Sequence, residues 1–178
     1  AGGLVGSTSG IINVNNSGTD LTLNQTGTST YSGKIQGVGS FIKEGAGNLT
    51  LNGIAGSVDL GTTNSSTGTF VNEGTLTTAS ANVFAADQDI TVNTDGTLHI
   101  KTGSQSVDTI TNSGIVNLDD DLTVRVLTNN ASGTFNQEAN ITATDTTSSA
   151  IMNGIWNVTG KDAVNTRVLN TVTLTGDA

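Results

Sequence analysis

The residues best suited to catalysis are the acidic run Asp119–Asp121 and Arg125, which follows it closely. Two carboxylates that face one groove can act as general acid and general base in the cleavage of a polysaccharide. The single histidine, His99, precedes this run, and no Arg-x-Lys motif follows it, so the residue set of galacturonan-type hydrolases is incomplete. We therefore interpret the run as a turn between the apolar segments 116–118 and 122–124 and predict that the chain is not an enzyme.

The sequence also gives little support for a metal site or for nucleophilic catalysis. The chain has no cysteine, which excludes disulfides and thiolate metal sites. His99 alternates with the apolar Leu98 and should point outward, without companions for a metal site or a Ser-His-Asp set. Weak calcium binding at Asp119–Asp121, or at Asp87 with Asp89, is the alternative, although no EF-hand loop or Gly-Gly-x-Gly-x-Asp repeat occurs. We predict no catalytic, metal or cofactor site, and the sequence identifies no ligand-binding residue.

A short element recurs along the chain and indicates which segments carry these residues. Each copy has a turn-forming residue, then a glycine, then a segment in which apolar and polar residues alternate. The five glycines are 22, 18, 19 and 21 residues apart, and they are Gly74, Gly96, Gly114, Gly133 and Gly154. Glycine adopts a positive φ without steric cost, so each copy can turn the chain sharply.

The position two residues after each of these glycines is always apolar, which predicts a stacked interior column. The five residues are Leu76, Leu98, Val116, Phe135 and Trp156. Alternation of this kind is typical of a strand with one buried face. One coil cannot bury its own apolar face, whereas stacked coils can.

We therefore predict an all-β fold, a right-handed parallel β-helix (β-solenoid) with about 18–22 residues per coil, as the glycine spacing indicates. Mostly three short strands per coil, roughly nine coils and a length of about 40 Å follow from the strand spacing. A β-sandwich is the alternative, but its turns recur every 8–12 residues, and the longer period favours the solenoid. Residues 78–87 are the best candidate for a helix and are expected to form a short turn or an outward loop.

Composition agrees with a polar solenoid and restricts the partners. Only 34% of the residues are hydrophobic and 12% are charged, and proline, which cannot donate to a strand ladder, is absent. The net charge is −9, and the six Lys and Arg residues are scattered, which argues against nucleic acid and anionic membrane surfaces. No run approaches the roughly 20 apolar residues of a transmembrane helix.

The segment 21–53 carries a more specific pattern. Its ordered elements are Tyr31-Ser32-Gly33, Ile35, Gly37-Val38-Gly39, Ile42-Lys43 and Gly45-Ala46-Gly47-Asn48-Leu49-Thr50-Leu51-Asn52-Gly53. This set resembles the passenger-associated transport repeat of bacterial type V autotransporters. That repeat reads Tyr-Ser-Gly, an aliphatic residue, Gly-x-Gly, an apolar-Lys step and Gly-x-Gly-x-Leu-x-Leu-x-Gly. The resemblance covers 33 residues.

The resemblance implies a place and a role for the chain. Autotransporter passengers cross the outer membrane through a C-terminal barrel of the same chain, and most fold outside the cell as a right-handed β-helix. We expect residues 1–178 to be a single β-helix fragment of a longer passenger at the bacterial cell surface. It would act as stalk and secretion-promoting segment of an adhesin. Alternatives are a fragment of a β-helical polysaccharide-degrading enzyme and a two-partner secreted filamentous adhesin.

The same resemblance suggests partners. They are the host cell surface or extracellular matrix, and the protein's own outer-membrane barrel during secretion. Exposed sheet edges at the two ends of the fragment would also allow self-association.

Within 21–53 we expect structural roles for the named side chains. Four leucines should point inward, namely Leu21, Leu23, Leu49 and Leu51. Of the adjacent Phe41 and Ile42, only one can face the core. Tyr31 should cover a corner and keep its hydroxyl in water. Lys43 and Glu44 should form a solvated pair.

Overall fold

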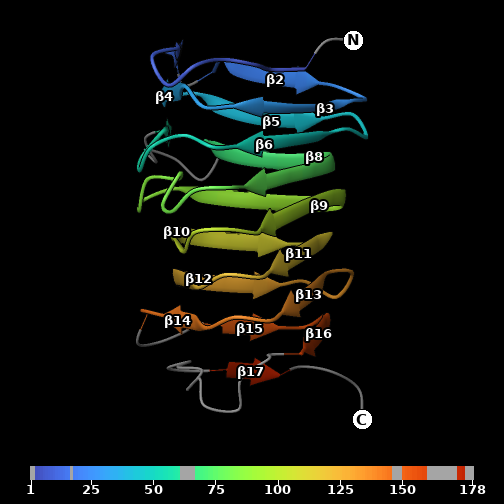
Figure 1. The fold of residues 1–178 in the computed structure, drawn as a ribbon. Helices are drawn as coiled ribbons and strands as arrows, with labels where there is room; N and C mark the ends of the chain where they lie inside the picture. The colour runs from blue at the N-terminus through green and yellow to red at the C-terminus, as the bar shows by residue number, and fades with distance from the viewer. Residues whose placement is uncertain (1–2, 17, 61–66, 146–149, 160–171, 175–178) are drawn as a thin grey trace.

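The protein is an all-β parallel β-helix of about seven turns, seen in a computed structural model (Figure 1). The structure describes residues 3–16, 18–60, 67–145, 150–159 and 172–174. Strands follow one another down the stack from the N-terminal to the C-terminal end (Figure 1), and every ladder between strands is parallel. The predicted fold class is confirmed. In the described part of the chain, no helix is long and apolar enough to cross a membrane.

Within the described residues, the strands form a small sheet of three strands and a large sheet of fourteen. The small sheet pairs β1 (Ile11–Val14), β4 (Lys34–Gly37) and β7 (Val58–Leu60). In the N-terminal half, the large sheet contains β2 (Asp20–Asn24), β3 (Thr28–Tyr31), β5 (Ser40–Glu44), β6 (Asn48–Leu51), β8 (Gly68–Thr78) and β9 (Asp89–Ile100). In the C-terminal half it contains β10 (Gln105–Asn112), β11 (Ile115–Leu118), β12 (Leu122–Asn129), β13 (Thr134–Gln137), β14 (Ile141–Ala143), β15 (Ala150–Met152), β16 (Ile155–Val158) and β17 (Val172–Leu174).

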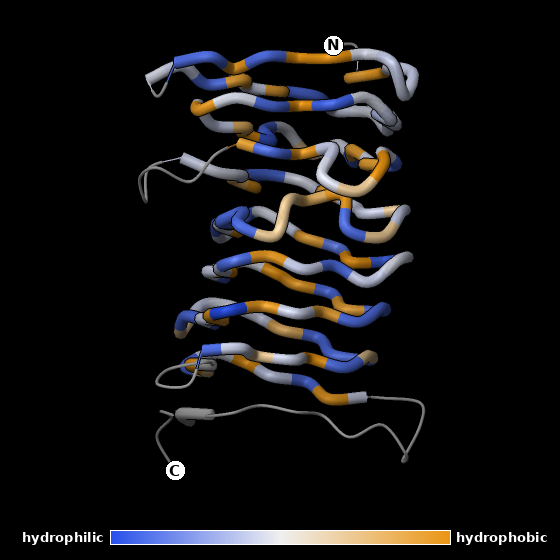
Figure 2. The backbone as a smooth tube through the Cα atoms, turned by 90° about the vertical axis from the view of Figure 1, so that its left-hand side faces the viewer, coloured by the Kyte–Doolittle hydropathy of each residue, from blue (hydrophilic) through white to orange (hydrophobic). Residues whose placement is uncertain are grey.

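The predicted interior column is confirmed by the register of the ladders. Its members pair in sequence from β6 to β16, in the order Leu49, Leu76, Leu98, Val116, Phe135 and Trp156. All except Trp156 are fully buried, and Trp156 packs against the core at the C-terminal end. Apolar and polar residues alternate along the coils (Figure 2). Each of these coils therefore gives one apolar side chain to this column of the core.

A second column on the neighbouring face mixes apolar and polar side chains. It runs through Leu23, Lys43, Val71, Val92, Asn112, Asn129 and Met152. Asn112 and Asn129 are fully buried, and Asn112 Nδ2 donates to Asn129 Oδ1 at 2.7 Å. Their remaining groups bond to turn backbone: Asn112 Oδ1 accepts from the Gly114 N–H, and Asn129 Nδ2 donates to the carbonyls of Gly133 and Ile155. The buried amides thus satisfy the backbone at the corners of the coils.

The recurring glycines are needed mainly because successive coils stack closely, and less because glycine can adopt a positive φ. Of the five, only Gly74 has a positive φ, +70°, so the other four turn the chain without using that conformation. At Gly114 a Cβ atom would collide with the carbonyl oxygens of Asn93 and Gly96, and at Gly154 with that of Gly133. Glycine is required there because the turn of one coil lies directly on the turn of the coil before it.

Coil length differs from the sequence-based expectation. The chain makes about seven turns, not nine, and Leu76 follows its partner Leu49 after 27 residues instead of 18–22. Residues 78–87 form no helix and no outward loop, and the expected short turn is present at 81–82 and again at 86–87, with the buried Val83 and Phe84 between the two turns. Phe84 bridges to Val58, which brings this segment into the core.

Most expected inward residues of 21–53 are buried. Leu49, Leu51 and Phe41 are buried, whereas Leu21 and Leu23, near the N-terminal end of the stack, are half-buried. Tyr31 differs from expectation: it is only 4% exposed, and its hydroxyl lies 3.2 Å from the Lys34 carbonyl oxygen and 3.4 Å from that of Gly10. Burial raises the pKa of this hydroxyl.

The column predicts a sharp contrast between neighbouring substitutions. Leu98→Ala should lower the free energy of unfolding by about 2–5 kcal/mol, because it opens a cavity between Leu76 and Val116. Thr97→Ala, on the outer side of the same strand, should change it by less than about 0.5 kcal/mol. Urea unfolding followed by circular dichroism measures both. Equal losses for the two variants would contradict the assigned faces.

Candidate functional site

The outer side of the column strands carries a rank of polar side chains. Each rank position follows a column residue, so it points away from the core. The ladders align Thr77, His99, Asn117, Asn136 and Asn157 on successive strands. From His99 onward, each of these side chains is at least partly exposed.

The three asparagines of this rank form an outer amide ladder. Asn157 Nδ2 donates to Asn136 Oδ1 at 2.8 Å, and Asn136 Nδ2 donates to Asn117 Oδ1 at 2.7 Å. An amide has two N–H donors and a two-lone-pair acceptor, so each ladder bond uses only part of its capacity. The ladder fixes the side-chain orientation and leaves each amide able to bond a ligand.

A groove of about 690 Å³ runs over this rank. Beside the amides lies a second outward rank, in which the backbone ladder continues through Asp119, Glu138 and Thr159. The residues that line the groove are His99, Asn117, Asp119, Asn136, Glu138, Trp156, Asn157, Val158 and Thr159. The lining therefore combines amides, carboxylates and one imidazole with some apolar surface at the C-terminal end.

His99 is held by the first residue of the acidic run. Its Nε2 lies 2.7 Å from Asp119 Oδ2, and the two side chains are 25% and 41% exposed. His99 points outward, as the sequence predicts. It has the neighbour Asp119, which sequence reasoning did not pair with it, because the pairing depends on the register of β9 with β11.

The other two aspartates of the run bind backbone and do not converge with Asp119. Asp120 Oδ2 accepts from the Gly103 N–H at 2.8 Å, and Asp121 Oδ1 accepts from the Asn140 N–H at 3.0 Å. They occupy the turn between β11 and β12, as predicted. Carboxylates used in this way stabilise neighbouring turns and are not positioned as an acid–base pair.

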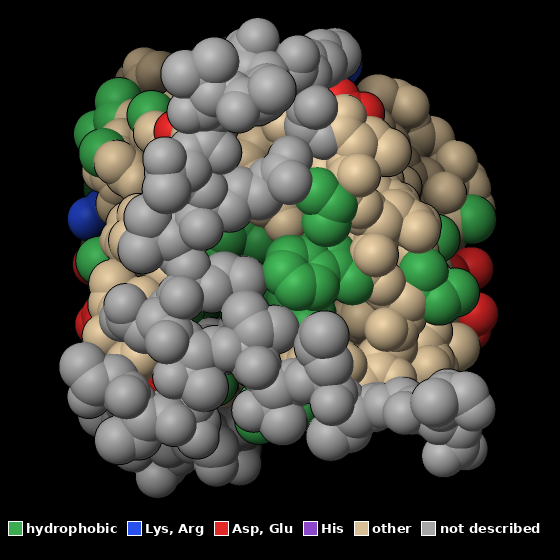
Figure 3. Space-filling view, turned by 90° about the horizontal axis from the view of Figure 1, so that it is seen from below, with side chains coloured by type: hydrophobic (Ala, Val, Ile, Leu, Met, Phe, Trp, Pro, Cys, Tyr) green, Lys and Arg blue, Asp and Glu red, His purple; other side chains and the backbone are tan. Residues whose placement is uncertain are grey.

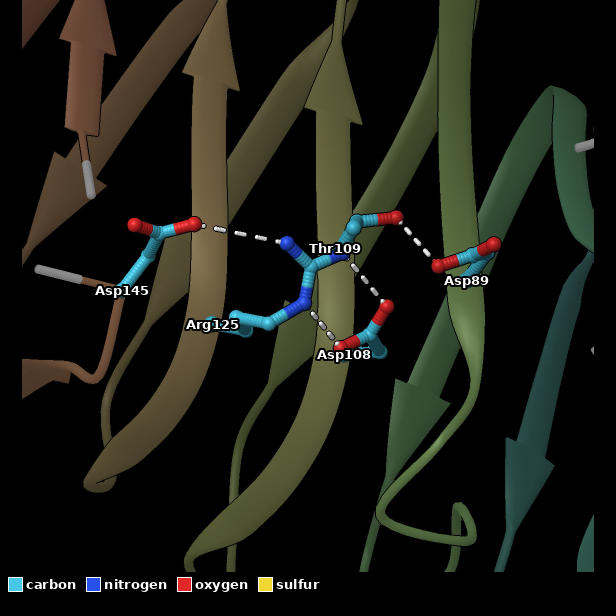
Figure 4. A network of polar contacts seen from close by, with 5 residues as sticks. All are labelled: Asp89, Asp108, Thr109, Arg125 and Asp145. Carbon is cyan, nitrogen blue, oxygen red and sulfur yellow. Dashed lines mark hydrogen bonds and ion pairs between the residues drawn. The ribbon is translucent and has the colours of Figure 1, made fainter. Parts of the chain in front are cut away.

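Arg125 belongs to a different cluster on the outer surface (Figure 4). Its Nε and Nη2 bind the two carboxylate oxygens of Asp108 at 2.6 and 2.8 Å, and its Nη1 lies 3.5 Å from Asp145 Oδ2. The hydrogen bonds and the charge of Asp108 raise the pKa of Arg125 above its ordinary value. Arg125 therefore does not join the acidic run 119–121, as the catalytic hypothesis would require.

Asp87 and Asp89, the other candidate calcium ligands, do not point toward a common site. Asp89 Oδ1 accepts from the Thr109 hydroxyl at 2.5 Å, beside the Arg125 cluster (Figure 4). Asp87 is exposed in the turn before β9. Within the described ranges, no group of three or more His, Cys, Asp or Glu side chains is arranged to hold a metal ion.

Lys43 contradicts its predicted role as one member of a solvated pair. It is fully buried in the second column, between Leu23 and Val71. Its Nζ donates to the carbonyl oxygens of Glu44, Gly45 and Glu73 at 2.9, 2.6 and 3.0 Å. The ammonium thus joins the corners of two successive coils.

The carboxylates near Lys43 complete this corner. Glu73 Oε2 accepts from the Gly45 N–H at 3.1 Å, and Glu44 Oε1 accepts from Asn72 Nδ2 at 2.8 Å. Desolvation lowers the pKa of Lys43, and the charges of Glu73 and Glu44 act in the opposite direction. The buried charge is therefore compensated by carbonyls and by two nearby carboxylates.

The sequence also carries a signal for the outer amide ladder. Asparagine stands three residues after Gly114, Gly133 and Gly154 alike. Strand alternation places this position outward whenever the column residue before it points inward. Recurrence of one polar residue type at an outward position is the mark of a side-chain ladder.

Comparisons with protein-family models, with curated proteins and with solved structures find no match to this chain.

Replacing Lys43 tests whether its hydrogen bonds hold the corner together. Lys43→Met keeps the length and removes the donors, so three carbonyls lose their partner. We expect the free energy of unfolding to fall by about 1–3 kcal/mol. Lys101→Met, at an exposed lysine, is the matched control and should be neutral. A Lys43→Met protein as stable as the parent would show that the three hydrogen bonds of Lys43 Nζ contribute nothing to stability.

Alkaline pH should increase the difference in free energy of unfolding between the parent protein and Lys43→Met. The unfolded chain keeps the Lys43 proton up to its ordinary pKa of 10.5, whereas the folded protein releases it earlier. In that window the unfolded state binds more protons, so the free energy of unfolding of the parent rises with pH relative to Lys43→Met. The raised pKa of Tyr31 acts in both proteins and cancels in the difference. Urea unfolding between neutral pH and pH 10.5 measures this difference, and a constant value would contradict the assignment.

Proposed function

We propose that the chain is a structural segment of a surface-displayed autotransporter passenger. In this proposal it is a stalk and a secretion-promoting, folding segment of an adhesin and carries no catalytic activity. The observation that carries the proposal is the unbroken stacking of interior columns across the coils, from Leu49 to Trp156. A rod of about seven turns would hold a distal domain about 30–35 Å from its base.

The segment 21–53 supports the secretion role. It covers most of β2 and all of β3 to β6, which belong to the first coils of the stack, and it contributes both Tyr31 and Lys43 to the interior. These are the two side chains that give the resemblance to the transport repeat its specificity. Their bonds to backbone carbonyls would help the first coils form a template on which later coils stack.

The disposition of the charged groups supports a structural role over a catalytic one. Asp120 and Asp121 bind turn backbone, and Arg125 is engaged by Asp108. The acidic outer surface fits contact with host cells or matrix as an expectation from the resemblance. During secretion, the partner would be the outer-membrane barrel of the same protein.

The ends of the stack give a route to self-association. Seen along the axis from the C-terminal end, hydrophobic side chains are visible in the middle, and Asp and Glu side chains lie at the rim (Figure 3). An exposed sheet edge over an apolar interior can pair with another such edge.

Two coil excisions test the proposal in the full reading frame that encodes this chain. Removing 97–114 or 20–39 deletes one whole register repeat, because Thr97 pairs with Ile115 and Asp20 pairs with Ser40. Both variants should therefore still fold. Only removal of 20–39, within the transport-repeat-like segment, should strongly lower the amount displayed on the cell surface. Antibody labelling of intact Gram-negative cells, normalised to total protein, measures this amount.

Different results of these experiments would contradict different parts of the proposal. Absence of the unmodified protein from the cell surface would contradict the passenger assignment. Equal surface delivery of the two excision variants would contradict the secretion-promoting role of 21–53 while leaving the stalk role in place. A reading frame that lacks a downstream membrane barrel would transfer the proposal to a partner-secreted filament.

A further inference from the structure

We propose that the groove over the outer amide ladder binds a neutral polysaccharide chain that lies along the axis of the solenoid. This inference does not rest on the proposed function, because it follows from the groove itself. It assigns a class of ligand to a surface that needs no ligand for the stalk role.

The shape of the groove fits a linear polymer. His99, Asn117, Asn136 and Asn157 come from four successive strands, β9, β11, β13 and β16, so the rank extends about 14 Å along the axis. The groove of about 690 Å³ over this rank is open. An asparagine amide therefore returns at three successive coils, which suits a ligand that repeats the same groups along its length.

The hydrogen-bonding chemistry of the groove fits hydroxyl groups. Asparagine amides both donate and accept, while the carboxylates of Asp119 and Glu138 accept. A sugar hydroxyl also donates and accepts, so it can pair with either kind of group. Trp156 and Val158, whose strand positions face the core, border the groove only at its C-terminal end.

Charge narrows the ligand class further. Asp119 and Glu138 lie in the groove, and the chain carries a net charge of −9. Acidic polysaccharides and other polyanions would be repelled by these charges. A neutral chain meets no such repulsion.

The rank is also held in place before any ligand arrives. The amide ladder fixes Asn117 and Asn136, and Asp119 fixes His99 at 2.7 Å. Groups that are already ordered lose little further conformational entropy when they bind.

Affinity electrophoresis and calorimetry test the proposal with named probes. The neutral probes are cellohexaose, xylan, galactomannan and dextran, with polygalacturonate as the acidic probe and chitosan as the cationic probe. We expect at least one neutral probe to bind in a salt-insensitive way, and polygalacturonate not to bind. For oligomers of the bound polymer, affinity should rise with length until the chain spans the groove.

Variants locate the binding site. Asn136→Ala and Asn117→Ala should each weaken binding about tenfold, the effect of losing one or two hydrogen bonds. Thr123→Ala, on an outward position of β12 away from the groove, should not, and circular dichroism verifies that all three fold. The proposal is overturned if no neutral probe binds, or if only chitosan binds and salt abolishes it. Binding unaffected by both asparagine variants would also overturn it.

Discussion

Parallel, in-register pairing between successive coils is the constraint on which the rest of this structure depends. The backbone of each coil is hydrogen-bonded to the coils before and after it, so a side chain that points inward in one coil lies on an inward side chain of the next. The sequence therefore has to supply a compatible residue at each repeat. This produces the apolar column from Leu49 to Trp156 and, one position along each strand, the outward rank from His99 to Asn157.

The same constraint explains the polar groups found in the interior. A coil must turn at its corners, and the carbonyl and N–H groups there need partners that strand pairing does not provide. Asn112 and Asn129 supply these partners in the C-terminal half, and Lys43 supplies them near the N-terminal end. Buried polar side chains in this fold thus act on the backbone of neighbouring coils. Their cost of burial is offset by bonds that the turns require.

Much of the fold could be predicted from sequence, because the period of the glycines and the alternation after them are visible in one dimension. The five predicted column residues pair in the predicted order. Lys43 could not be placed by charge, since a lysine beside a glutamate looks solvated. Alternation from the buried Phe41 would have placed it inward. The carbonyl oxygens that compensate the buried ammonium include that of Glu73, which reaches Lys43 only when the next coil lies against it.

The groove could be predicted only in part, because the sequence shows the recurring asparagine but not which side chains lie beside it. Asn117, Asn136 and Asn157 are separated by whole coils, and their contact depends on coil lengths that vary from 17 to 28 residues between paired residues. The pairing of His99 with Asp119 likewise needs the register of two strands. Composition suggested only an acidic, polar surface. The structure orders part of that surface into two parallel ranks that line one groove.

The register itself is the claim to test most directly, and the absence of cysteine makes the test clean. Thr97 and Ile115 are outward partners on adjacent strands, so their Cα atoms should lie about 5 Å apart, within the range of a disulfide. We predict rapid, near-complete disulfide formation in Thr97→Cys/Ile115→Cys under mild oxidation. Thr97→Cys/Asn117→Cys, displaced by two residues along the same face, should remain reduced. The opposite result, or equal cross-linking of both pairs, would contradict the stacked register on which both the column and the groove depend.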